Sequence, residues 1–171
     1  MMQYTSEGRA PVIWHEENVG IPASGNRPYV LVVDDDPAIA SVVMLTLEME
    51  EYAGLSISDS RQVLPFLQQV EADVTKHLPA VILLDLMMPG LSGYEVAAQL
   101  AQRPCFARIP IVVMTADYRV RTAGAVPGAT ELLSKPFPVS ALLTVLEHYL
   151  SSVPNAVPCL SVPHRGDARI A

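Results

Sequence analysis

Cysteine is scarce in this sequence, and long apolar runs are absent. Cys105 and Cys159 are the only cysteines, too few for a disulfide framework and without metal-ligand spacing, so we expect two reduced thiols. The longest apolar runs are about the size of 80–84 and 111–114, far short of the roughly 18 residues that cross a bilayer. The first ten residues offer no apolar run for a secretory signal. The sequence therefore predicts a cytoplasmic protein with no membrane association.

Basic charge is also in short supply. The chain of 171 residues has 11 Lys and Arg against 18 Asp and Glu, a formal net charge of −7. An acidic chain has little to set against phosphate, so we expect no direct DNA binding. Half of the residues are hydrophobic, which is enough to offset the ordering entropy of folding and excludes a wholly disordered chain.

The middle of the chain differs from its two ends. Residues 1–28 and 151–171 carry prolines and glycines without an apolar period, and we read them as a flexible N-terminal extension and a flexible C-terminal tail. The exception is 12–15, Val-Ile-Trp-His, where the only tryptophan could dock on the body or be incidental. The segment 29–150 is predicted to be one folded domain.

Within 29–150, short apolar runs alternate with segments of helical period. Because these runs are apolar throughout, both faces of the sheet they form should be covered by helices. The pattern predicts a three-layer α/β/α sandwich with a five-stranded parallel sheet, built from five βα units. The expected strands are 29–33, 53–58, 80–84, 110–114 and 130–134, and the expected helices are 36–50, 60–72, 92–102, 118–124 and 139–150.

Polar side chains follow four of these strands, where the ligands of parallel sheets bind. Asp34, Asp35 and Asp36 follow the first strand, and Asp36 is expected to cap the next helix. Asp85 follows the third strand, Thr115 the fourth and Lys135 the fifth.

Crowded carboxylates repel one another, and a hard cation such as Mg²⁺ relieves that repulsion. A carboxylate with a free face can attack phosphorus, while lysine and a hydroxyl group neutralise and bind the phosphoryl oxygens. The arrangement therefore predicts metal-assisted phosphoryl transfer to an aspartate.

Four sequence motifs also carry a family resemblance. Residues 32–37 (VVDDDP), 81–90 (VILLDLMMPG), 112–116 (VVMTA) and 133–137 (LSKPF) resemble the receiver domain of two-component response regulators. The resemblance covers nearly all of 29–150, and it implies the flavodoxin-like (βα)5 topology. It also implies a signalling phosphoacceptor rather than an enzyme that turns over other substrates. Because the 21 residues after 150 are too few for an output module, we expect the receiver to stand alone.

The resemblance implies a role for each matching residue. Asp85 looks like the phosphoacceptor and Asp35 like the direct Mg²⁺ ligand, with Asp34 acting beside it. The backbone carbonyl of Met87 and the carboxylate of Asp85 complete the implied metal shell. Thr115, with Ala116 after it, looks like the phosphoryl-binding switch, and Lys135 would pair with the phosphoryl group or with Asp85. The bond from Lys135 to Pro136 resembles one that is usually cis in the family.

Three features depart from the usual family pattern. Leu132 stands where many receiver domains have the Tyr or Phe that moves with the switch threonine. Residues 117–128 are rich in Gly, Ala and Pro and make a poor fourth helix. The connection 68–79 is longer than usual, and its role is open.

The partners implied are a histidine kinase or histidine phosphotransfer protein and a protein target that the sequence does not name. The sequence leaves a homodimer open. Two alternatives remain: an unphosphorylated receiver-like interaction module and a phosphatase of the haloacid dehalogenase type, in which Asp34 would be the nucleophile.

Overall fold

The computed structural model describes residues 13–14, 28–73, 76–117 and 126–151 of the chain. The helices α1, α2, α3 and α5 span Pro37–Met49, Val63–Ala72, Gly93–Ala101 and Val139–Ser151, and the short 3₁₀ helices η2 and η3 span Ser60–Gln62 and Phe106–Arg108. The strands β1 to β6 span Ile13–Trp14, Tyr29–Val33, Ala53–Ile57, Val81–Asp85, Ile111–Thr115 and Glu131–Ser134.

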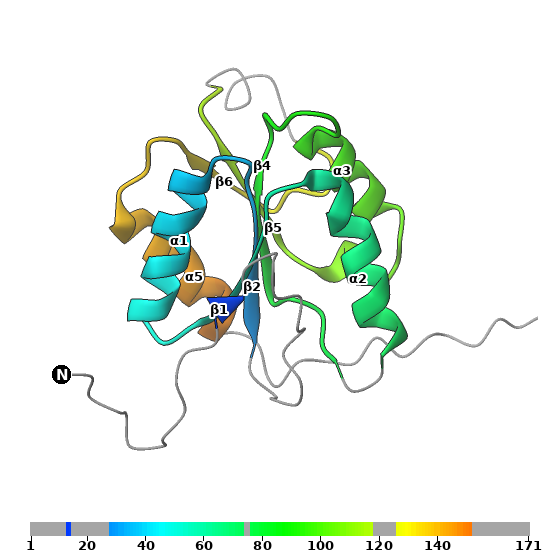
Figure 1. Ribbon diagram of the computed structural model, residues 1–171, viewed down its shortest axis with the longest axis horizontal. Helices are drawn as coiled ribbons and strands as arrows, with labels where there is room; N and C mark the ends of the chain where they lie inside the picture. Colours follow the sequence, from blue (N-terminus) through cyan, green and yellow to red (C-terminus); the bar gives the residue numbers. More distant parts are fainter. Residues whose placement is uncertain (1–12, 15–27, 74–75, 118–125, 152–171) are drawn as a thin grey trace, which may run out of the picture.

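The strands form one parallel sheet in the order β1-β3-β2-β4-β5-β6. Helices α1 and α5 lie on one side of it and α2 and α3 on the other (Figure 1). This confirms the predicted three-layer sandwich and its parallel sheet of five strands, β2 to β6. The short β1 is a sixth strand, added to the outer side of β3.

Local signals in the sequence set where the helices begin. The Asp36 side chain accepts a hydrogen bond from the Ala38 backbone N–H at 2.9 Å, and Pro37 opens α1. Helix α3 begins with a capping box, in which the Ser92 hydroxyl accepts from Glu95 N–H and the Glu95 carboxylate accepts from Ser92 N–H. Asp36 is thus the helix cap that the sequence predicts.

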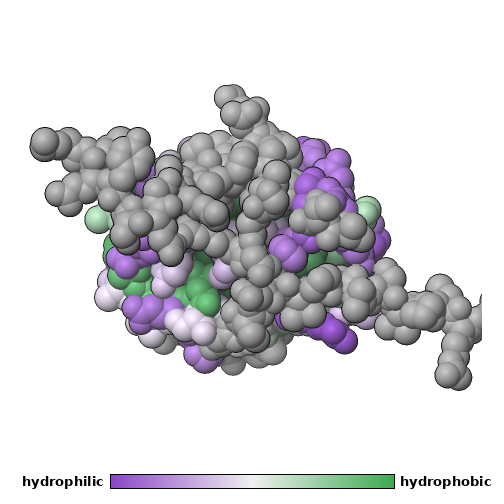
Figure 2. Space-filling model, turned by 90° about the horizontal axis from the view of Figure 1, so that it is seen from below, coloured by the Kyte–Doolittle hydropathy of each residue, from purple (hydrophilic) through white to green (hydrophobic). Residues whose placement is uncertain are grey.

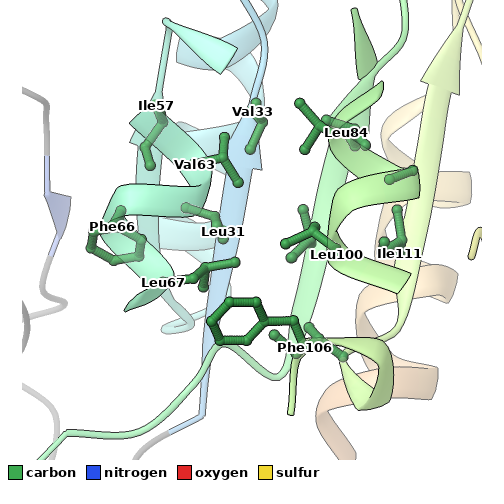
Figure 3. Packing of buried hydrophobic residues seen from close by; sticks show 14 of the residues in the cluster. Leu31, Val33, Ile57, Val63, Phe66, Leu67, Leu84, Leu100, Phe106 and Ile111 are labelled. Carbon is green, nitrogen blue, oxygen red and sulfur yellow. The ribbon is translucent and has the colours of Figure 1, made fainter. Parts of the chain in front are cut away.

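The hydrophobic core has two halves, one on each face of the sheet. Successive residues of β2 alternate between them, because side chains in a strand point to opposite faces. Val30 and Val32 pack with α1 and α5, whereas Leu31 and Val33 pack with α2, α3 and η3 (Figure 3). In Figure 3 the Phe106 ring lies at one end of this second half, beside Leu67.

The carboxyl ends of the parallel strands lie together at one edge of the sheet. The strands run so that their carboxyl ends lie at the upper edge in Figure 1. Figure 2 views the opposite end, where green hydrophobic and purple hydrophilic residues lie side by side on the coloured surface. The polar strand-end residues singled out from the sequence therefore share the upper edge.

Some expectations are changed or left open by the structure. The predicted helix 60–72 is a 3₁₀ turn followed by α2, with Pro65 in the first turn of α2. The predicted fourth helix, 118–124, lies outside the described residues, as do residues 152–171 of the C-terminal tail and most of the N-terminal extension. Ser151, the first residue assigned to the tail, is the last residue of α5. Cys105 is disulfide-bonded, which corrects the expectation of a reduced thiol there; Cys159 lies outside the described residues.

Candidate functional site

The site is assembled by the ends of β2, β4, β5 and β6. Asp34 directly follows β2, Asp85 ends β4, Thr115 ends β5, and Lys135 directly follows β6. These four strands are neighbours in the sheet. Because they are parallel, the four side chains come to the same edge although they are far apart in the sequence.

Three carboxylates meet at this edge. Asp34, Asp35 and Asp85 each offer a carboxylate oxygen, and these oxygens lie within 4.8 Å of one another. Asp34 and Asp85 are buried, with 1% and 5% of their surface exposed, whereas Asp35 is exposed. The backbone holds the buried pair in place: Asp36 N–H donates to Asp34 Oδ1 at 3.0 Å and Met87 N–H donates to Asp85 Oδ2 at 3.1 Å.

Lys135 joins the two buried carboxylates. Its Nζ donates to Asp34 Oδ2 at 2.6 Å and to Asp85 Oδ1 at 3.0 Å, and the lysine side chain is only 12% exposed. The Lys135 backbone N–H donates to the Thr115 carbonyl at 2.8 Å, so β5 fixes the position of the lysine. The Lys135–Pro136 peptide bond is cis.

Burial and the ion pairs act in opposite directions on the pKa values here. Burial raises the pKa of Asp34 above its ordinary value, although the Lys135 ammonium group and the Asp36 N–H both favour the carboxylate. Burial alone would lower the pKa of Lys135, but its hydrogen bonds to Asp34 and Asp85 outweigh that effect and raise it. The lysine therefore stays charged and stabilises two carboxylates that would otherwise repel each other.

The other predicted site residues surround this cluster. Thr115 is buried, and its hydroxyl oxygen accepts from Asp117 N–H at 3.0 Å. Ala116 is exposed, and Leu132 is half-buried and packs against the core half that contains Leu31. Met87, two residues after the end of β4, has an exposed side chain, at 67%. The roles of these four residues remain predictions.

Gly93, the first residue of α3, is a structural part of the site that the sequence analysis did not single out. A Cβ atom on Gly93 would lie 2.0 Å from the Asp85 carbonyl oxygen and 2.8 Å from the Leu86 Cα. Its N–H donates to the Leu86 carbonyl at 3.1 Å. Only a residue without a side chain lets α3 begin this close to the end of β4. No signal in the sequence distinguishes this close approach from a turn.

We therefore expect Gly93→Ala to destabilise the protein by about 2–3 kcal/mol, because the clash is with backbone atoms that cannot move aside. Gly90→Ala is the matched control: a Cβ atom there would meet only the Arg61 side chain, at an ordinary contact distance of 3.9 Å, and the φ of Gly90 is +83°, which costs about 1–2 kcal/mol for alanine. Urea unfolding measures both. A smaller loss for Gly93→Ala than for Gly90→Ala would contradict the close-packing argument.

Together, the fold and site define a doubly wound α/β domain with an acidic, lysine-bridged edge. Residues 30–147 match the family described as the response regulator receiver domain. The chain belongs to this family, whose domain is a signalling domain and not a classical enzyme.

Similar proteins support the assignment to this family. The chain is 34% identical over 119 residues to the transcriptional regulatory protein BaeR of Escherichia coli O6:H1, covering 68% of this chain and 45% of that one. It is 31% identical over 155 residues to the DNA-binding dual master transcriptional regulator RpaA of Synechocystis, covering 82% and 61%.

Solved structures give the same answer. The response regulator protein TrrA of Thermotoga maritima, in complex with Mg²⁺–BeF, is 25% identical with a TM-score of 0.62, and the match covers 72% of this chain and 99% of that one. The resemblance to receiver domains inferred from the four motifs is therefore confirmed.

The comparisons correct one expectation. We expected no direct DNA binding. The relatives are named as transcriptional and DNA-binding regulators, and this finding contradicts that expectation. The chain spans about half the length of the curated relatives it matches. Among the described residues, no helix is long and apolar enough to cross a membrane.

Proposed function

We propose that this protein is a phosphoacceptor in a histidine-to-aspartate phosphorelay and that Asp85 accepts the phosphoryl group. The observation that carries the proposal is the meeting of three carboxylates and one bridging lysine at the ends of neighbouring strands. An ordinary surface turn has no need for two buried carboxylates that share one ammonium group. Burying charged groups costs free energy even when they are paired, so the arrangement indicates a functional site.

The donor set fits a magnesium ion. Asp34, Asp35 and Asp85 would hold it, with the Met87 carbonyl as a further oxygen ligand, since hard cations prefer oxygen ligands. When bound, Mg²⁺ supplies positive charge that offsets the negative charge of the phosphoryl group. A similar protein, TrrA, has a solved complex with Mg²⁺–BeF, which supports the same assignment here.

The chain's own residues then define the reaction. An Asp85 carboxylate oxygen attacks phosphorus, a P–O bond forms, and the P–N bond of the donor phosphohistidine breaks with its electron pair remaining on the imidazole nitrogen. Lys135, already 3.0 Å from Asp85 Oδ1, neutralises the transferred oxygens. The Thr115 hydroxyl at the end of β5 and the backbone of Ala116, the next residue, would bind the same group.

Phosphorylation would act on contacts with other proteins. It adds negative charge at an edge where Lys135 is shared between Asp34 and Asp85, so the ion pairs must rearrange. The Thr115 hydroxyl, now bonded to Asp117 N–H, is the group we expect to exchange its partner.

Incubation with a small-molecule phosphodonor tests the proposal. We expect mass spectrometry to show one added phosphoryl group that depends on Mg²⁺, disappears with a chelator and is labile in alkali, as an acyl phosphate should be. Mapping the modified peptide separates the alternatives. No adduct would favour the unphosphorylated interaction module, and modification of Asp34 would favour the phosphatase; either result contradicts the proposal.

A further inference from the structure

Cys105 lies in the connection between α3 and β5, at the end of the sheet opposite the acidic edge. Helix α3 begins beside the Asp85 carbonyl at the carboxyl end of β4, so its other end and Cys105 after it lie near the amino ends of the strands. Cys105 is disulfide-bonded, and the chain has one other cysteine, Cys159, outside the described residues.

The segment around Cys105 is held firmly in place. The Ala107 N–H donates to the Arg103 carbonyl at 2.8 Å, and the Ile109 N–H donates to the Phe106 carbonyl at 3.0 Å. The Phe106 ring is fully buried in the core half between the sheet and helices α2 and α3 (Figure 3), and the Arg103 guanidinium carbon lies 5.8 Å from the ring centroid. Cys105 is half-buried and packs against the same core half. A bond to its sulfur therefore fastens the partner segment to a fixed part of the domain.

The end of α5 comes to the same end of the sheet. The Tyr149 hydroxyl donates to the carboxylate of Glu131, the first residue of β6, at 3.2 Å. The starts of β6 and β5 are joined in turn, because the Thr130 N–H donates to the Ile111 carbonyl at 2.8 Å. Helices α5 and α3 lie on opposite sides of the sheet (Figure 1), so a connection from α5 to Cys105 passes the amino ends of these two strands.

The sequence supplies a connection of suitable length. Seven residues, 152–158, separate the last residue of α5 from Cys159, and they reach up to about 25 Å when extended. Helix layers on the two sides of a sheet lie about 20 Å apart, since each packs about 10 Å from it. The family match ends at residue 147, so a bond to Cys159 would join the domain to a segment beyond it.

We propose that Cys105 and Cys159 form a redox-controlled tether, which holds residues 152–158 against the amino edge of the sheet when oxidised and releases them when reduced. The reagent class is a small-molecule disulfide such as oxidised glutathione. One cysteine thiolate attacks a sulfur of the reagent and displaces one thiol; the second cysteine attacks the resulting mixed disulfide and displaces the other. The two cysteines thereby lose two electrons and two protons, and the reagent is reduced to two thiols.

A glutathione titration of the full chain tests the tether, with alkylation and intact-mass spectrometry as the readout. The bonded fraction should rise from about one-tenth to about nine-tenths when the ratio of oxidised glutathione to the square of reduced glutathione rises about a hundredfold. Peptide mapping should join Cys105 to Cys159 in a monomer, and Cys159→Ser should leave Cys105 open to alkylation. A bond that persists at every ratio, two thiols that stay free, or a disulfide between two chains would each overturn the proposal.

Thermal unfolding measures what the tether does to the folded protein. The bond closes a span of 54 positions in the unfolded chain but only the connection 152–158 in the folded one, so the net loss of chain entropy favours the folded state. We expect the oxidised parent to melt roughly 5 °C above the reduced parent. Cys159→Ser, which leaves every described residue unchanged, should melt with the reduced parent and ignore the reductant. Equal melting temperatures for oxidised and reduced parent would contradict a tether to the folded domain.

Discussion

Asp85→Asn should abolish phosphorylation by a small-molecule donor, to below the detection limit of intact-mass spectrometry. The amide is neutral and its oxygen is a poor nucleophile, so the attacking group is lost. The change is otherwise small. The asparagine oxygen can still accept from Met87 N–H, and Lys135 keeps its 2.6 Å bond to Asp34. The loss of the adduct would therefore report on chemistry and not on unfolding.

Asp36→Asn is the matched control for that experiment. Asp36 belongs to the same acidic run as Asp34 and Asp35, but it is exposed and caps α1. Asparagine caps a helix about as well as aspartate, so this variant should keep both its stability and the Mg²⁺-dependent adduct. Labelling that is equal in Asp85→Asn and the parent would refute Asp85 as the acceptor. Labelling lost in both variants would show that the acidic run acts as a unit.

The sequence predicts those features of the fold that depend on local pattern. The runs 29–33 and 111–114 are buried strands because their apolar residues leave no polar face. Asp36 and Pro37 mark the start of α1 by capping chemistry that involves only neighbouring residues. The approach of Asp34, Asp85 and Lys135 follows from the parallel topology, which brings strand ends to one edge whatever their separation in the sequence.

Features that depend on contacts between distant segments are not predictable in this way. The pairing of Ile13–Trp14 with β3 is two residues long, too short for any periodicity to show. The need for glycine at position 93 comes from the Asp85 carbonyl oxygen, which belongs to another element. Lys135 is in the motif, but only the structure shows that it bonds to Asp34 as well as to Asp85.

Lys135→Met should cost about 3–5 kcal/mol of stability, because it leaves the nearly fully buried Asp34 carboxylate without its compensating charge. Methionine fills a similar volume, so the loss measures charge and not packing. Lys76→Met is the matched control, since the chain has only these two lysines and Lys76 forms a more exposed ion pair with Asp73. Such a pair contributes at most about 1 kcal/mol.

The pH dependence of Lys135→Met gives the sign of the effect. Burial already raises the pKa of Asp34, and Lys135 opposes that rise; without the lysine, the pKa of Asp34 in the folded protein rises further above its unfolded value. A carboxyl group with a raised folded pKa binds its proton more tightly when folded, so the free energy of unfolding grows as the pH falls through that pKa. The stability gap between the variant and the parent should therefore narrow as the pH is lowered from neutrality through the raised pKa of Asp34. Urea unfolding in a chelator measures it, and a gap that stays constant or widens on acidification would show that the lost stability does not come from an unpaired Asp34 carboxylate.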